Sequence, residues 1–250
     1  MEPFVYDVES RVEESHWWFA GRRRLLARVI DELNLPKDAR VLDVGSGTGT
    51  NLRLLSQLGF INFTGVDASE SSIRFCSEKG FGTVEMGDAC DLPCEDRSVD
   101  LVLATDIVEH LDDDAAALRE FRRVLRPGGC AIVTVPAFQS LWGLQDEVSH
   151  HKRRYRKRDF ESRITNAGLG LRRSFYFNYL LFGPIWLARQ CIRLFRVRLE
   201  SENQLNTSAL NSALSCLFAF DVWSAPFLRP FFGVSIFALT ERTEQPGLAE

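Results

Sequence analysis

Short apolar runs alternate with amphipathic segments through the middle of the chain. Five of these runs have the composition of buried parallel strands: 40–45, 62–69, 81–89, 98–106 and 130–138. The segments between them space their apolar residues three or four positions apart, which predicts helices over about 49–58, 70–79 and 112–125. Strands that alternate with helices in this way predict a parallel sheet with helices on both faces.

Both ends of the chain add elements to this α/β core. The run "HWWFAGRRRLLARVIDELNL" has helical spacing and stops before Pro36, and residues 150–168 predict another helix from about 156 to Gly168. Strand-like runs over 171–178 and 233–242 bring the sheet to seven strands. We therefore expect a doubly wound, mostly parallel Rossmann-like sheet.

The expected organisation is a single domain that uses residues 1–250. Its parts are a helical N-terminal lid (1–38), a Rossmann-like core (39–178 and 233–242) and a helical cap or insertion between the last two strands (179–232).

Composition agrees with a folded domain, and the charge is unevenly distributed. The chain is 45% hydrophobic and 26% charged, with a formal net charge of −4. Residues 151–200 hold 13 Lys and Arg against 3 Asp and Glu, so the rest of the chain sums to −14. A basic segment in an acidic protein suggests an anionic partner, although a solvated basic helix face would give the same pattern.

The six cysteines and the apolar runs bear on localisation. No two cysteines form a C-x-x-C pair, which favours reduced thiols in a cytoplasmic protein. The N-terminal "MEPFVYDVES" has no apolar run, and no stretch reaches 18 uninterrupted apolar residues. We therefore expect neither a signal peptide nor a membrane-spanning helix.

The first predicted strand runs into a glycine-rich turn, "VLDVGSGTGT" (41–50). Glycines there let a ligand approach the backbone closely. In the dinucleotide fingerprint G-x-G-x-x-G the third glycine comes one position later than it does here. Asp43, two residues before the first glycine, suits a cationic or hydrogen-bond-donating ligand better than a pyrophosphate.

This turn and the motifs after it resemble the class I S-adenosylmethionine (SAM)-dependent methyltransferases. The resemblance covers about residues 40–136 and rests on "VLDVGSGTG", "GVDAS", "GDACDLP", "SVDLVLATDIVEHL" and "LRPGG" with "AIVTVP", in this order. The N-terminal "HWWFAGRRR" is similar to a subset of bacterial small-molecule methyltransferases. The resemblance implies SAM as the cofactor and methyl transfer as the activity.

The resemblance also implies which residues hold SAM. Asp67 would accept from the ribose hydroxyls, Asp88 and the N–H of Ala89 would meet the adenine, and Arg23 would grip the cofactor carboxylate. Trp17 and Trp18 would form a lid, or else pack the N-terminal helix on the sheet. The full expected set is Trp17, Arg23, Asp43, Gly45, Ser46, Gly47, Gly49, Asp67, Ala68, Asp88, Ala89 and Thr105.

An acceptor hydroxyl needs a base when it attacks the SAM methyl, and histidine titrates near neutral pH. His110 follows the fourth strand, and His150 and His151 follow the fifth, so each is a candidate base or a hydrogen-bonded structural histidine. Asp106, Glu109 and His110 would share one helical turn. They resemble a metal-holding motif of some ubiquinone-pathway and small-RNA methyltransferases, but similar segments occur in metal-free members, so we assign no metal.

The segment 179–199 has the composition of an amphipathic helix, with Arg189, Arg193 and Arg196 on one face. It would cap a pocket for a lipophilic acceptor, lie in a membrane interface, or form an oligomer contact. The basic run 152–158 would meet a phosphate on the acceptor. These features favour O- or C-methylation of a small, hydrophobic molecule by a cytoplasmic, membrane-peripheral enzyme.

Three other functions stay open from the sequence. An RNA methyltransferase would use the basic run 152–158, but no known RNA-binding module is visible. A SAM-binding regulator would keep the motifs without transferring methyl. A dinucleotide-dependent oxidoreductase is disfavoured by the glycine spacing.

Overall fold

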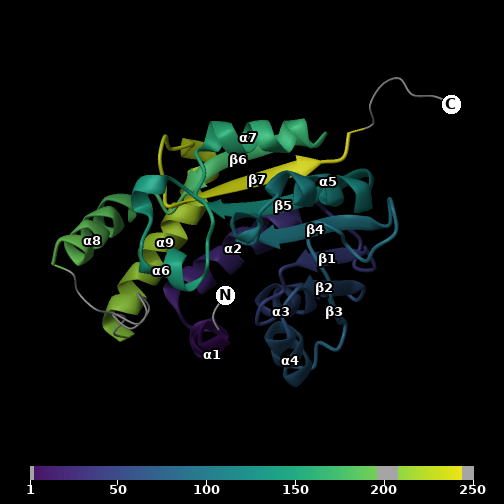
Figure 1. Cartoon of the computed structure of the whole chain (residues 1–250), viewed down its shortest axis with the longest axis horizontal. Helices are drawn as coiled ribbons and strands as arrows, with labels where there is room; N and C mark the ends of the chain where they lie inside the picture. The colour runs from purple at the N-terminus through teal and green to yellow at the C-terminus, as the bar shows by residue number, and fades with distance from the viewer. Residues whose placement is uncertain (1–2, 196–207, 244–250) are drawn as a thin grey trace. The chain divides into compact units, whose positions relative to one another are not determined.

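The computed structural model describes residues 3–195 and 208–243. Its strands form a seven-stranded sheet in the order β3-β2-β1-β4-β5-β7-β6 (Figure 1). The strands are β1 (Val41–Val44), β2 (Phe63–Asp67), β3 (Val84–Met86), β4 (Val99–Thr105), β5 (Leu125–Pro136), β6 (Gly170–Phe177) and β7 (Ser235–Glu241). The predicted seven-stranded Rossmann-like sheet is confirmed.

The central strands are parallel. β1 pairs with β2 and β4, β2 pairs with β3, and β4 pairs with β5, all in parallel register. Asp43 lies opposite Gly65 on one side and Leu103 on the other. Because parallel strands end at the same edge, the carboxyl ends of β1, β2 and β4 meet there.

β7 runs antiparallel to β5. Gly128 donates to the Arg242 carbonyl at one end of the pair, and Ala137 donates to the Val234 carbonyl at the other. β5 also begins at Leu125, earlier than the expected 130. The Pro-Gly-Gly run at 127–129 therefore belongs to β5. The backbone of Arg242 hydrogen-bonds to both Gly128 and Gly129.

The helices lie where amphipathic patterning places them, with several additions. They are α1 (Pro3–Val12), α2 (Trp17–Glu32), α3 (Thr50–Gln57), α4 (Glu70–Glu78), η1 (Val108–His110), α5 (Asp114–Val124), η2 (Gln139–Leu141), α6 (Leu144–Val148), α7 (Lys157–Asn166), α8 (Phe182–Phe195) and α9 (Ser208–Leu228). η1, η2 and α6 follow β4 and β5. α8 and α9 form the expected helical insertion between β6 and β7.

The N-terminal lead-in is two helices rather than one. α2 begins at Trp17, where His16 Nδ1 accepts from the Trp18 N–H at 3.3 Å, and it ends at Glu32, before Pro36. Burial lowers the pKa of His16, which keeps the ring neutral and able to accept this hydrogen bond.

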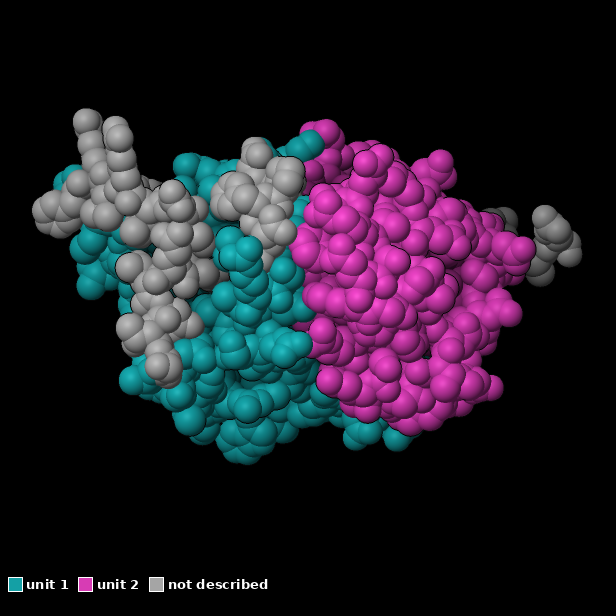
Figure 2. Space-filling view, turned by 90° about the horizontal axis from the view of Figure 1, so that it is seen from below, with its two compact units in different colours: residues 1–35, 135–157, 175–236 teal, residues 36–134, 158–174, 237–250 magenta. Residues whose placement is uncertain are grey.

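The chain divides into two compact units, which Figure 2 draws in different colours. Unit 1 comprises residues 1–35, 135–157 and 175–236, and unit 2 comprises residues 36–134, 158–174 and 237–250. The first unit holds the N-terminal helices and the insertion, and the second holds the glycine-rich turn and most of the sheet.

Within unit 2, apolar packing and one arginine hold helices to the sheet. Leu52, Cys76 and Val84 form a buried cluster that joins α3 and α4 to β3. At the end of β7, the Arg242 guanidinium donates to the carbonyls of Arg122, Arg123 and Leu125 at 2.8–2.9 Å. These bonds satisfy the carbonyls that the last turn of α5 leaves without helical partners.

Within unit 1, α2 packs on α9. Phe218 is fully buried, and its ring stacks on Trp18 with 5.3 Å between centroids. Gly21 lies against the same ring, and a Cβ at this position would overlap Phe218. Arg28 adds hydrogen bonds to the carbonyls of Val222 and Trp223. The α2–α9 contact therefore requires a residue without a side chain at position 21.

Among the described residues, no helix combines the length and apolarity that a membrane crossing needs.

We predict that Gly21→Val destabilises the protein. The added side chain must push Phe218 out of its buried position, and overpacking of this kind costs about 1–3 kcal/mol. Urea unfolding followed by circular dichroism measures the loss.

The matched control is Arg24→Ala, an exposed position on the same helix, which should change the unfolding free energy by less than about 0.5 kcal/mol. Combining Gly21→Val with Phe218→Leu should recover part of the loss. Equal stabilities of Gly21→Val and wild type would contradict the packing.

Candidate functional site

The glycine-rich turn between β1 and α3 is a left-handed backbone segment. Gly45, Gly47 and Gly49 have φ of 75°, 53° and 82°, a region that other residues enter only at a cost. A Cβ at Gly47 would come within 4.0 Å only of the Gly45 carbonyl oxygen, whereas one at Gly45 would lie 2.8 Å from Ile107. The turn thus leaves open space at Gly47.

Helix α4 holds the carbonyls of this turn. Ser72 Oγ donates to the Gly47 carbonyl at 2.7 Å, and Lys79 Nζ donates to the Thr48 carbonyl at 2.7 Å. Cys76 also lies against the turn, and burial raises the pKa of its thiol to about 12. The turn is therefore fixed before any ligand binds.

Asp67, the last residue of β2, joins the second strand to the turn. Its Oδ2 accepts from the Gly47 N–H at 2.8 Å, and its Oδ1 accepts from the Ser69 N–H at 2.9 Å. Each carboxylate oxygen can accept a further hydrogen bond. Two adjacent hydroxyls, such as those of a ribose, match this arrangement. Ala68, the next residue, is exposed.

A buried polar network links the ends of β1 and β4. Asn51 Nδ2 donates to Asp43 Oδ1 at 2.8 Å and to Thr105 Oγ1 at 2.9 Å. Asn51 lies in the first turn of α3 and has no counterpart in the residues predicted from the sequence. Its Oδ1 is buried and accepts no hydrogen bond from any described residue. A buried acceptor of this kind suits a ligand that brings an amino group.

The remaining predicted residues of unit 2 follow β1 and β3 in the chain. Ser46 Oγ donates to the Asp43 carbonyl at 3.1 Å. Asp88 is exposed and accepts from the Cys90 N–H at 2.8 Å, and Ala89 is buried. The sequence predicts a strand over 81–89, which would contain both residues. β3 instead ends at Met86, so Asp88 and Ala89 lie in the loop after it.

Trp17 and Arg23 belong to unit 1, and their described contacts stay within it. The Trp17 N–H donates to Asn211 Oδ1 at 2.9 Å, and its ring meets Phe218 edge to face. The Arg23 guanidinium donates to the carbonyls of Glu13 and Glu14. These contacts hold the start of α2 against the preceding turn and α9.

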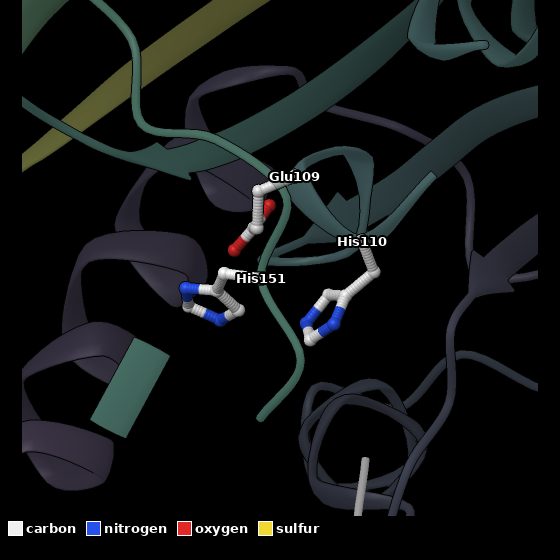
Figure 3. Close-up of side chains that lie close together, drawn as sticks. All are labelled: Glu109, His110 and His151. Atoms are coloured by element: carbon white, nitrogen blue, oxygen red, sulfur yellow. The ribbon is translucent and has the colours of Figure 1, made fainter. Parts of the chain in front are cut away.

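The segment after β4 differs from the expected helical turn over 106–110. Asp106 has φ of 56°, and its Oδ1 accepts from Thr134 Oγ1 at 3.2 Å. It precedes η1, a 3-10 helix that contains only Val108–His110. Figure 3 shows the side chains that Glu109 and His110 send out from neighbouring positions of η1. Glu109 is fully buried and His110 is half-buried.

His151 is held by a carboxylate within unit 1. Asp146 is fully buried, and its Oδ1 lies 2.8 Å from His151 Nδ1. Arg154 donates to both carboxylate oxygens, at 2.7 and 3.0 Å, and the Gly143 N–H donates to Oδ2 at 2.7 Å. Asp146 fixes the tautomer in which Nδ1 carries the proton of the neutral ring, so Nε2 is the basic nitrogen.

The three candidate histidines therefore differ in their support. His150 is exposed, has φ of 56° and follows α6, whereas the Asp146 carboxylate orients His151. Burial alone would raise the pKa of Asp146, but the His151 hydrogen bond and the Arg154 guanidinium lower it to about 2. The carboxylate stays charged at neutral pH.

The sequence puts Arg189 on one face of an amphipathic helix with Arg193 and Arg196, and the structure buries its side chain. Its guanidinium donates to the Leu141 carbonyl and lies 3.7 Å from Asp146 Oδ2. Burial of Asp146 draws this cation inward. The side chain of Arg193 and all of Arg196 lie outside the part of the chain that the structure describes.

Sequence comparison identifies relatives of the central part of the chain. Residues 42–133 match the family model described as methyltransferase domain. Demethylmenaquinone methyltransferase from Staphylococcus aureus is 33% identical over 129 residues, which is 47% of this chain and 54% of that protein. The chain thus spans about half the length of this curated relative.

Structure comparison extends over nearly the whole chain. One similar chain comes from the complex of a methyltransferase with the Trm112 methyltransferase activator of Haloferax volcanii. It has a TM-score of 0.66 and 18% identity, with 98% of this chain and 96% of that chain covered. A SAM-dependent methyltransferase from Thermotoga maritima gives 0.60 and 19%, with 96% and 95% covered. At these identities the likeness shows the fold.

We predict that Asp146 makes stability depend on pH in the acid range. Its folded pKa of about 2 lies below the ordinary value of 3.8, so its contribution is complete above about pH 4 and is lost as the pH falls towards 2. The contribution amounts to about 2 kcal/mol. Urea unfolding of wild type and Asp146→Asn across this range measures it.

The stability difference between wild type and Asp146→Asn should be constant above pH 4 and should narrow towards pH 2. Glu147→Gln, an exposed neighbour on α6, is the matched control and should follow wild type. A difference that stays the same between pH 4 and pH 2 would show that Asp146 does not titrate there.

Proposed function

We propose that the protein is a class I SAM-dependent methyltransferase and that it transfers the SAM methyl group to a small lipophilic acceptor. The match of residues 42–133 to the methyltransferase domain supports this proposal. The observation that carries the proposal is the left-handed glycine turn fixed to Asp67 at the carboxyl edge of the sheet. This arrangement offers hydrogen-bond acceptors and open backbone to a nucleoside with an amino-acid arm.

The proposed cofactor contacts follow the polar groups of this edge. Asp67 accepts from both ribose hydroxyls, and Asp88 with the Ala89 N–H meets the adenine. Asp43 and the Oδ1 of Asn51 receive the ammonium group of the methionine arm, for which two neighbouring acceptors are suited. Gly47 leaves the space in which the cofactor passes over the turn. Trp17 and Arg23 remain proposed contacts of the methionine end.

The acceptor is proposed to be a lipophilic molecule with an acidic hydroxyl, such as an isoprenoid quinol or a phenol. The demethylmenaquinone methyltransferase relative supports this class, and so do the apolar residues of the insertion. On an acceptor that also carries a phosphate group, the basic run 152–158 would meet that phosphate.

His151 is the proposed base. It follows β5 in the chain, and Asp146 orients its ring so that Nε2 accepts the hydroxyl proton. The Asp146 carboxylate then stabilises the imidazolium that forms. Arg154 and Arg189 keep the carboxylate ionised by their charge. Asp146 is therefore a positioning residue that acts through His151.

The reaction is an in-line displacement. SAM supplies a methyl group that its positive sulfur activates. With SAM bound, the acceptor's oxygen or carbon would form the new bond to this methyl while the methyl–sulfur bond breaks, and the electron pair of that bond would go to sulfur. His151 takes the acceptor's proton and returns it to solvent. The protein's main contribution is alignment in a site from which water is excluded.

We predict that the protein binds SAM and not NADH in calorimetric titration. Asp67→Ala should weaken SAM binding by about tenfold or more, because the ribose hydroxyls lose a charged acceptor. Asp67 also bonds the Gly47 N–H, so the variant's unfolding free energy is measured in parallel.

Glu78→Ala, an exposed acid at the end of α4, should bind SAM like wild type. Binding of NADH without SAM would reject the proposed function in favour of an oxidoreductase. Binding of SAM with no methyl transfer to any lipophilic acceptor would favour a regulator, and transfer to RNA alone would reject the acceptor class.

We predict that His151→Gln lowers kcat by about 100-fold and leaves SAM affinity unchanged, because the variant keeps the shape but loses the base. Transfer of labelled methyl from SAM to a panel of isoprenoid quinols and phenols measures the rate.

His150→Gln is the matched control, since this neighbour is exposed and should retain wild-type kcat. Equal loss in both variants, or full activity of His151→Gln, would remove His151 from the mechanism. His110→Gln tests the other candidate in the same assay.

A further inference from the structure

Helix α9 and the turn after it expose a run of large apolar side chains. The run comprises Phe220, Trp223, Phe227, Leu228, Phe231 and Phe232 and is called the α9 surface below. Phe227 is 74% exposed and Phe231 is 93% exposed, although aromatic side chains of this size usually lie in cores. A connected set of exposed aromatics marks an interaction surface rather than a scatter of single residues.

The exposed side of α9 differs from the side that packs within unit 1. Phe220, Trp223 and Phe227 follow each other at spacings of three and four, so they share one side of the helix. Their rings lie 5.8 and 6.1 Å apart between successive centroids. The residues that pack inward are different ones, among them Phe218 and Ala225, which are fully buried. α9 is therefore apolar on its outer side as well as its inner side.

Charge on the α9 surface has one sign. Asp221 is the only carboxylate in residues 208–232, and it is fully buried. Arg229, between the helix and Phe231, is exposed. α8 contains no acidic residue and exposes Trp186 and Leu187. Residues 208–232 thus offer apolar groups and an exposed cation, and their one carboxylate is buried.

We propose that the α9 surface docks on an anionic phospholipid membrane. Phe227 and Phe231 enter the acyl boundary, Trp223 lies at the headgroup level, and Arg229 meets lipid phosphates. Phe231 protrudes from a turn, and a bilayer accepts such a side chain without a matching pocket, which a second copy of the chain would have to supply. In this arrangement α9 lies along the membrane interface.

Membrane docking would bring the enzyme to its acceptor, so its role rests on the proposed function. A lipophilic acceptor resides in the bilayer, so an enzyme docked there meets it without extracting it into water. The docking itself requires neither SAM nor an acceptor, and it can be measured separately.

The test is flotation of the full chain with vesicles. Phosphatidylcholine vesicles that contain about 30% phosphatidylglycerol provide the anionic surface, and pure phosphatidylcholine vesicles provide the neutral one. The wild type should float with the anionic vesicles and more weakly with the neutral ones. Phe227→Ser combined with Phe231→Ser should reduce the vesicle-bound fraction by about tenfold or more.

The control combines Ile61→Ser with Met86→Ser, which removes two exposed apolar side chains from unit 2 and should float like wild type. Because all four positions are exposed, both variants should keep the wild-type unfolding midpoint. Failure of the wild type to float, or flotation of the Phe227/Phe231 variant at the wild-type level, would overturn the proposal. The proposal would also be overturned if neither protein floated with vesicles and if the wild type formed a dimer in solution that the Phe227/Phe231 variant did not form.

SAM titration of the same proteins separates the two proposals. Flotation with no SAM binding would leave docking standing and reject the proposed function. SAM binding with no flotation would reject membrane docking and leave the proposed function standing. The Phe227/Phe231 variant should bind SAM like wild type and lose only its vesicle-bound fraction.

Discussion

The hydrogen bond from the Gly47 N–H to the Asp67 carboxylate, at 2.8 Å, connects the turn after β1 to the end of β2. It can form only because two adjacent parallel strands end at one edge and because Gly47 takes a left-handed conformation with φ of 53°. Ser72 and Lys79 hold the carbonyls of the turn. The N–H groups and carboxylates of this edge are thereby fixed in advance, which lowers the entropic cost of binding a cofactor.

A second buried carboxylate organises the loop after β5 in a comparable way. Asp146 gathers His151, Arg154 and the Gly143 N–H, and Arg189 approaches from α8. A buried carboxylate is tolerated only when several donors replace its hydration. The same donors fix the orientation of His151, so one residue serves both the stability of the loop and the direction of its histidine.

The sequence predicts the strands and the turn because their signals are local. A strand buried on both faces, such as β1, reads as a short and mostly apolar run, and a turn with several left-handed positions favours glycine at them. Asn51 and Asp146 were missed for the opposite reason. Asn51 resembles any polar residue in a first helical turn, and Asp146 resembles an exposed acid of "LQDEV". Their burial depends on partners such as Thr105 and Arg189, which are distant in sequence.

The burial of Asp221 leaves the outer side of α9 without a carboxylate. The Asp221 carboxylate accepts from the N–H groups of Asn178 and Leu180, at 2.6 and 2.8 Å, where β6 leads into α8. Burial nevertheless raises its pKa to about 6, so desolvation outweighs these bonds. A helix that puts its only carboxylate inside and leaves Trp223 and Phe227 outside reverses the usual arrangement of a water-exposed helix. This reversal costs free energy in water, and an apolar partner on the outer side would offset the cost.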